Sequence, residues 1–109
     1  MPDTVNRVIL LGTAATHVEL RAVPGGTVAW FQLATTSQWT DPNTKLERTR
    51  VQWHRVVAET PALVRFAESR IRRDALIYVD GFLRTRNWTS GSGAPRSAQE
   101  IIAREIRAL

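Results

Sequence analysis

Alternation of apolar and polar residues along the chain predicts a series of β-strands. In Thr27–Thr36 the odd positions Ala29, Phe31 and Leu33 form one apolar face, and the even positions point the other way. Val5–Gly12 is apolar at its centre and stops at a glycine, as a first strand would. Further extended segments are predicted, the first of them short, at His17–Val23, Arg48–Ala58 and Ala75–Trp88.

Turn-forming residues separate these segments. Pro24-Gly25-Gly26 ends the short extended stretch. The polar segment Ser37–Glu47 contains Asp41-Pro42-Asn43 and is expected to be a loop. Thr89–Arg96 is rich in serine and glycine, and we expect a second loop there.

One segment changes to helical spacing. Thr60 followed by Pro61 is typical of a helix start, with threonine as the N-cap and proline at the first helical position. Apolar residues then recur at helical intervals at Leu63, Phe66, Ala67 and Ile71. The last segment is ambiguous, because the same residues fit a strand of alternating isoleucines and charges or a helix with a capping box at Ser97–Glu100.

The predicted order is three strands, one helix and two strands in a single domain, residues 1–109. That order is the order of the OB-fold, a five-stranded Greek-key barrel with its helix between strands 3 and 4. The predicted fold class is therefore all-β with one helix. Folds of this kind bind oligonucleotides and oligosaccharides on one face and its loops.

Composition supports one soluble domain and removes several classes of protein. The chain has 109 residues, of which 43% are hydrophobic and 23% charged. Apolar runs such as Val8–Leu11 fall far short of the roughly 20 residues that span a bilayer, so no membrane association is expected. The start of the chain has no secretion-signal pattern. The absence of cysteine excludes disulfide scaffolds and cysteine-based metal sites, and we expect a cytoplasmic, nucleoid-associated protein.

Charge points to a polyanionic partner. The net charge is +5, and fourteen of the fifteen basic residues are arginine, whose planar fork pairs with phosphate and stacks on flat rings. Residues 1–44 carry two basic and three acidic residues, whereas residues 45–109 carry thirteen and seven. A basic protein with one richer half is typical of nucleic-acid binding, although many small basic domains bind nothing.

Four tryptophans are many for a chain of this size. Trp39 lies in the predicted polar loop, where we expect it to be exposed and to stack on a base. Trp88 shares a strand face with Arg84 and Arg86, and aromatic rings interleaved with arginines suit single-stranded nucleic acid. The pattern alone does not assign a role to the other two tryptophans. The strand of Trp53 has mixed faces, and Trp30 could stack a base or fill a subunit interface.

Catalysis finds no support in the residue pattern. His17 and His54 are the only histidines, and no carboxylate cluster has metal-ligand spacing. No phosphate-binding loop or nucleophile elbow is present. We therefore expect no enzyme activity, no metal and no cofactor, and we expect a structural or interfacial role for His54.

Several stretches resemble the bacterial single-stranded DNA-binding proteins, and together they cover nearly the whole chain. They are NRVILLG at 6–12, VELRAVPGG at 18–26, FQLATTSQW at 31–39, QWHRVV at 52–57, IYVDGFLRTRNW at 77–88 and EIIAREIRAL at 100–109. The resemblance implies an OB-fold, a homotetramer and binding of single-stranded DNA without sequence preference. It also implies that the last segment is a strand.

The resemblance carries roles to individual positions. It implies base stacking by Trp39, Trp53 and Trp88, and we add Trp30 as a candidate. Basic residues expected along the DNA are Arg55, Arg72, Arg73, Arg84 and Arg86. His54 is implied in subunit assembly, and we place Tyr78 at the same oligomer interface.

Three features depart from the family pattern. An aromatic residue usually follows HRVV, but here the sequence is Ala58-Glu59-Thr60, so one platform is lost and an acid is gained. Trp30 replaces a residue that is usually smaller or polar. The family's flexible tail with its acidic tip, which recruits other enzymes, does not follow Leu109, so we expect no tail-mediated partners.

These features leave one leading hypothesis and three alternatives. The leading hypothesis is a non-enzymatic single-stranded DNA-binding protein that protects DNA during replication, recombination or repair. The alternatives are a dimeric primosome or recombination accessory that acts through protein contacts, an OB-fold nuclease, and a protein that binds mainly RNA.

Overall fold

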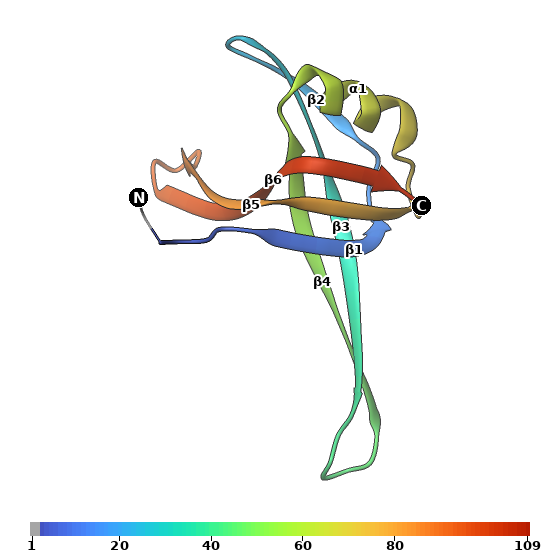
Figure 1. Ribbon diagram of the computed structural model, residues 1–109. Helices are drawn as coiled ribbons and strands as arrows, with labels where there is room; N and C mark the ends of the chain where they lie inside the picture. The colour runs from blue at the N-terminus through green and yellow to red at the C-terminus, as the bar shows by residue number, and fades with distance from the viewer. Residues whose placement is uncertain (1–2) are drawn as a thin grey trace.

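The computed structural model describes residues 3–109 as six strands and one short helix (Figure 1). Every segment predicted as extended forms a strand, including the short one before Pro24. The elements in chain order are β1 (Val8–Ala14), β2 (Glu19–Val23), β3 (Gly26–Thr40), β4 (Glu47–Ala58), α1 (Pro61–Arg70), β5 (Leu76–Thr89) and β6 (Pro95–Ala108).

Five of the strands close into a barrel. The strand order is β1-β5-β6-β4-β3-β2, and an additional pairing of β1 with β3 closes the ring. β4 and β6 run parallel at Val56–Ile101, and the other pairs are antiparallel. β2 pairs with β3 alone, outside the barrel. The predicted OB-fold is confirmed, with the helix between β4 and β5 once the short strand β2 is counted.

The barrel interior follows the predicted alternation. Phe31 and Leu33 of β3 are fully buried, as are Val56 of β4 and the β5 residues Ile77 and Val79. Side chains two residues apart on a strand share a face, so these five meet in the middle of the barrel. Burial of this apolar surface is the main favourable contribution to folding.

The single helix covers one end of the barrel. Its start is as predicted: Thr60 caps α1 by accepting a hydrogen bond from the Leu63 backbone N–H at 3.4 Å, and Pro61 follows as the first helical residue. Val64 and Ala67 are buried, and Ile71 ends the helix with its side chain in the core. In the described part of the chain, no helix has the length and apolar character needed to cross a bilayer.

The predicted loop at Thr89–Arg96 is shorter than expected, because Thr89, Pro95 and Arg96 are strand residues and only residues 90–94 turn. Two further predictions, of the type of segment, are wrong. Ser37–Glu47 was expected to be a loop, but β3 continues to Thr40 and only residues 41–46 turn. The helical alternative for the last segment is also wrong, because Ser97–Glu100 pairs with β5 along its length. In both places, cross-strand hydrogen bonds to a neighbouring strand override a local pattern.

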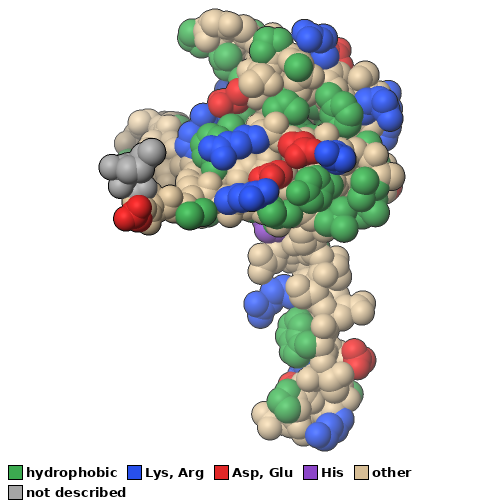
Figure 2. Space-filling model, in the orientation of Figure 1, with side chains coloured by type: hydrophobic (Ala, Val, Ile, Leu, Met, Phe, Trp, Pro, Cys, Tyr) green, Lys and Arg blue, Asp and Glu red, His purple; other side chains and the backbone are tan. Residues whose placement is uncertain are grey.

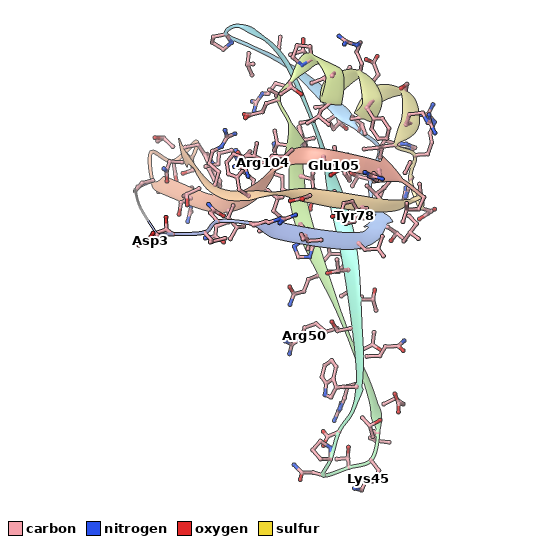
Figure 3. The ribbon with its side chains drawn as sticks, viewed as in Figure 1. Asp3, Lys45, Arg50, Tyr78, Arg104 and Glu105 are labelled. Atoms are coloured by element: carbon pink, nitrogen blue, oxygen red, sulfur yellow. The ribbon has the colours of Figure 1, made fainter. Side chains whose placement is uncertain are left out.

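The β3–β4 and β5–β6 hairpins extend beyond the barrel, as does the turn between β2 and β3 (Figure 1). The β3–β4 hairpin pairs continuously from Ala29–Ala58 to Thr40–Glu47, and its outer half is exposed to solvent. Figure 3 shows Lys45 near its tip and Arg50 about midway along it. The β5–β6 hairpin extends in a second direction and ends in residues 90–94.

A β-bulge interrupts the pairing of β5 with β6. Asp80 lies opposite Glu105, but Gly81 lies opposite Ala103, which leaves Arg104 as the extra residue. The strands approach so closely here that a Cβ on Gly81 would lie 2.1 Å from the Ile102 carbonyl oxygen. Glycine at this position therefore permits the close approach next to the bulge.

Candidate nucleic-acid interface

A groove crosses the outer face of the barrel between the β2–β3 hairpin and the β5–β6 hairpin. It encloses about 240 Å³ and contains four arginines and two glutamates. Its lining combines these charges with apolar side chains and one tryptophan, and consists of Arg21, Val23, Val28, Trp30, Arg55, Val57, Glu59, Arg84, Arg86 and Glu100.

Arginine side chains lie over three of the four tryptophan rings, two of them in or beside the groove. Arg55 of β4 lies over Trp30 of β3, with its guanidinium carbon 3.8 Å from the ring centroid. Arg86 lies over Trp88 at 4.3 Å, from two positions earlier on β5. In each pair the guanidinium covers one face of the ring, so a base stacks on the other face or takes the place of the arginine, which then turns to the phosphate.

A buried glutamate holds the groove arginines in place. Glu100 of β6 is 4% exposed, and its carboxylate lies 3.3 Å from Arg55, 3.1 Å from Arg84 and 3.6 Å from Arg86. The Nε groups of Arg55 and Arg86 are buried without a hydrogen bond of good geometry. Burial, together with the neighbouring Arg86, lowers the pKa of Arg55. Three positive charges therefore share one buried negative charge.

A second acid binds Arg84 at the edge of the groove. Glu59 accepts two hydrogen bonds from the Arg84 guanidinium, at 3.1 Å and 2.7 Å. The bond to Glu59 is the main cause that raises the pKa of Arg84. This bidentate pair occupies the donors that a phosphate would use, so a DNA strand at Arg84 competes with Glu59.

Trp53 and Trp39 lie on opposite faces of the β3–β4 hairpin. Trp53 pairs with Ala34, which shares a face with Trp30, so Trp53 continues the groove face and is 64% exposed. Trp39 is an odd number of residues from Ala34, so it points to the other face. It is 43% exposed and has Arg50 5.6 Å from its ring centroid. The predicted exposure of Trp39 is confirmed, although it lies on a strand.

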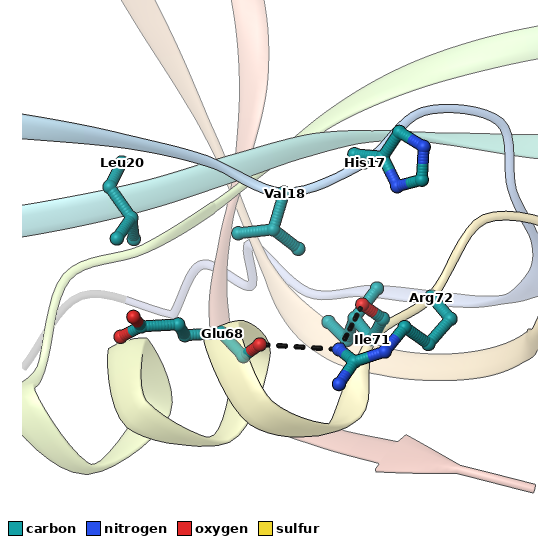
Figure 4. A pocket seen from close by; sticks show the side chains of 6 residues that line it. All are labelled: His17, Val18, Leu20, Glu68, Ile71 and Arg72. Carbon is teal, nitrogen blue, oxygen red and sulfur yellow. Dashed lines mark hydrogen bonds between the residues drawn. The ribbon is translucent and has the colours of Figure 1, made fainter.

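Arg72 and Arg73 lie apart from the groove. Both follow α1, and Arg72 donates hydrogen bonds to the backbone carbonyls of Glu68 and Ile71, at 3.3 Å and 3.2 Å (Figure 4). Arg72 lines a different hollow, beside His17. This hollow has no lining residue in common with the groove. The structure therefore brings Arg55, Arg84 and Arg86 together and leaves the other two predicted arginines elsewhere.

The two predicted interface residues lie on different surfaces. His54 is half-buried on β4, where its Nε2 lies 2.8 Å from the Thr35 hydroxyl, and burial lowers its pKa. Tyr78 lies on the outside of β5, directly opposite Leu11 of β1. Leu11 and its β1 neighbour Ile9 are each 53% exposed, and they share this face with the Arg7–Asp80 and Arg107–Glu105 ion pairs. Figure 2 shows hydrophobic side chains beside paired charges on the side that carries β1, β5 and β6.

Within residues 3–109, no group of three or more histidine, cysteine, aspartate or glutamate side chains could hold a metal ion. The acids of the groove are bound to arginines instead, Glu100 to three of them and Glu59 to one. The groove therefore has the features of a binding surface.

Comparison with known proteins shows the family to which the chain belongs. The family model of the single-strand binding protein family matches residues 5–109. The chain belongs to this family. Members of the single-strand binding protein family are non-enzymatic DNA-binding proteins.

Two solved structures of the family are similar to the chain. One is an SSB of Plasmodium falciparum in complex with single-stranded DNA, with a TM-score of 0.90 and 29% identity over 100% of this chain and 98% of that chain. The other is a deletion mutant of the single-stranded DNA-binding protein of Thermus aquaticus, with a TM-score of 0.80 and 27% identity. That match covers 96% of this chain and 50% of the other.

Sequence reasoning missed several residues of the groove. Glu100 was assigned to a capping box, and Arg21 and Val28 received no role, yet all three line the groove. The signal for Glu100 was available, because pairing the last segment with β5 places it directly opposite Arg84. Arg50, which lies over Trp39, was also missed. It lies on β4 opposite Ser37, two residues from Trp39 on the same strand face, and this became visible only once β3 was known to continue to Thr40.

Proposed function

We propose that the protein binds single-stranded DNA without sequence preference, as a non-enzymatic protector of DNA in replication, recombination or repair. The observation that carries this proposal is the pair of arginine-covered rings, Arg55 on Trp30 and Arg86 on Trp88, in and beside a basic groove. The match to a family member in complex with single-stranded DNA supports it.

The proposed mechanism combines stacking with charge neutralisation. Bases stack on Trp30, Trp53 and Trp88, at about 1–3 kcal/mol for each base. Arg55 and Arg86 neutralise phosphates, and each contact releases counterions from the strand. Neither interaction reads the edges of the bases, so binding is insensitive to sequence.

We propose that the opposite face of the β3–β4 hairpin extends the binding surface. Trp39 with Arg50 repeats the aromatic-plus-arginine arrangement there. A DNA strand that leaves the groove and follows the β3–β4 hairpin reaches Trp39 and Arg50 by passing round the edge of that hairpin. Arg72 and Arg73 would contact only DNA that continues past the helix to the far side of the barrel.

We propose a homotetramer as the functional assembly. The exposed side chains of Ile9 and Leu11, with Tyr78 opposite Leu11, form a small apolar patch among ion pairs, and association would remove this patch from water. The alternative is the dimeric accessory protein that acts through protein contacts. Light scattering separates them, because the 12.3 kDa chain would give four copies for the tetramer and two for the accessory dimer.

The test of DNA binding is intrinsic tryptophan fluorescence during titration with oligo-thymidine, at low and high salt, with duplex DNA as the control. Strong quenching by the single strand, a weak response to the duplex and a steep loss of affinity with salt are expected. An unchanged signal with the single strand would show that the tryptophans do not contact bases. The same titration with oligo-uridine tests whether RNA is the preferred ligand.

A further inference from the structure

A second hollow adjoins the groove on the side of the helix. It encloses about 560 Å³, within the roughly 300–1,000 Å³ typical of small-ligand sites. Its walls are mainly apolar, with Leu63 from α1, Phe82 from β5 and Ile102 from β6. Glu59 lines both this hollow and the groove, so the two lie side by side with that residue between them.

The bulge in β6 places an arginine over the aromatic ring of this hollow. Arg104 is the extra residue of the bulge, and its guanidinium carbon lies 4.9 Å from the centroid of Phe82. Figure 3 shows Arg104 on β6 beside Glu105. Bulges redirect side chains, and this one aims a positive charge at a ring. The hollow therefore contains an arginine over an aromatic ring, like Arg55 over Trp30 in the groove and Arg86 over Trp88 beside it.

Phe82 also continues a row of side chains along β5. Phe82, Arg84, Arg86 and Trp88 are spaced two residues apart, so they share one face of the strand. The row has an aromatic ring at each end and two arginines between them. The carboxylate of Asp80 pairs with Arg7 at 2.8 Å, and within residues 3–109 Arg104 forms no ion pair. Its charge is therefore available to a phosphate.

We propose that this hollow is an additional nucleotide-binding subsite, in which a base stacks on Phe82 and Arg104 contacts the adjoining phosphate. The inference rests on the proposed binding of single-stranded DNA in the groove. The occupant is the continuation of the same DNA strand past Glu59, because the hollow adjoins the groove at that residue and carries the same arginine-and-ring pair.

The experiment measures the affinity of the full chain for oligo-thymidines of stepwise increasing length, at several salt concentrations. The variants are Phe82→Ala, Phe82→Tyr and Arg104→Ala. Leu83→Ala is the matched control, because Leu83 is the next residue on β5 and points to the opposite face. Melting curves show that each variant is folded.

Phe82→Ala should weaken binding about tenfold, only for oligonucleotides long enough to reach from the groove into the hollow, with an unchanged salt slope. Phe82→Tyr should keep the parent affinity. Arg104→Ala should lower the salt slope by about 0.7, the value for one phosphate contact on a single strand. Leu83→Ala should bind as the parent does.

Folded Phe82→Ala and Arg104→Ala variants that bind every length with the parent's affinity and slope would overturn the subsite and leave the proposed function standing. A change confined to self-association would also overturn it, because the hollow would then belong to an interface between copies. If Phe82→Ala does not fold, the slope of Arg104→Ala decides, since Arg104 is exposed. A parent chain that binds no oligo-thymidine would refute the proposed function itself.

Discussion

Arg84 and Glu100 lie directly opposite each other on β5 and β6, and their side chains form an ion pair of 3.1 Å at the edge of the groove. Glu100 is almost completely buried, whereas Arg84 remains accessible. Because Glu100 also approaches Arg55 and Arg86, one buried carboxylate orients three guanidinium groups toward the same surface. The positions of Arg55 and Arg86 thus depend on this one acidic residue, whereas Arg84 is also held by Glu59.

Replacing that acid should destabilise the fold. In Glu100→Gln the three arginines lose their shared countercharge and repel one another, and we expect a loss of about 1–3 kcal/mol in the free energy of unfolding. Urea denaturation measures it. The control is Glu105→Gln, because Glu105 lies on the same strand but pairs with the exposed Arg107, and its loss should stay below about 1 kcal/mol. Equal stability of Glu100→Gln and the parent would contradict this role.

Removing Glu59, the acid at the groove edge, should strengthen the binding of single-stranded DNA. Glu59→Gln frees Arg84 from its bidentate partner, so affinity for single-stranded DNA should rise severalfold and the salt slope should steepen by about 0.7. Glu68→Gln changes the net charge equally but lies in the other hollow, beside Arg72. Titrations of both variants at several salt concentrations separate a local effect from net charge. An equal gain in both would exclude competition at Arg84.

The opposite placement of Trp53 and Trp39 predicts a dependence on oligonucleotide length. Trp53→Ala should weaken binding of short oligo-thymidines that fill the groove, by about 1–3 kcal/mol. Trp39→Ala should weaken binding only of longer strands that reach the other face of the hairpin. Trp88→Ala should resemble Trp53→Ala without lowering the melting temperature, because Trp88 is 40% exposed. Equal effects of Trp39 and Trp53 on the shortest ligand that binds would contradict this arrangement.

His54 makes stability depend on pH. Burial lowers its pKa below the ordinary value of 6.5, so the unfolded chain binds a proton at a higher pH than the folded chain. The free energy of unfolding is therefore highest above about pH 6.5 and decreases as the pH falls below that value. Melting temperatures at pH 7.5 and 5.5 test this for the parent, His54→Gln and the exposed-site control His17→Gln. The decrease should be smaller in His54→Gln alone, and the same decrease in all three would refute it.

Local patterns predicted most of the fold. The alternation of Ala29, Phe31 and Leu33 identified the buried face of β3, and Thr60 with Pro61 identified the start of α1. These predictions succeed because strand faces repeat every two residues and helix caps need only adjacent residues. The local pattern alone could not assign the last segment, because its residues satisfy both the helical and the strand period. Only its pairing with β5 selects the strand.

The groove was harder to predict from sequence than the fold, because its residues come together only in the tertiary structure. Composition and spacing identified Arg84, Arg86 and Trp88, which are close together on one strand. They could not place Arg55 against Trp30, bury Glu100 beneath three arginines, or separate Arg72 from the groove. Each of these relationships joins elements distant in the chain.

The sequence by itself determined the order of the elements up to the last segment, the apolar face of β3 and the basic, aromatic character of the chain. Those properties follow from side-chain chemistry and from periods of two or a few residues along the backbone. Tertiary structure decided the strand register, and with it that Trp53 faces the groove while Trp39 faces away from it. The physical reason is that a shift of one residue in register moves a side chain to the opposite face of the sheet, and register is set by the pairing of whole strands.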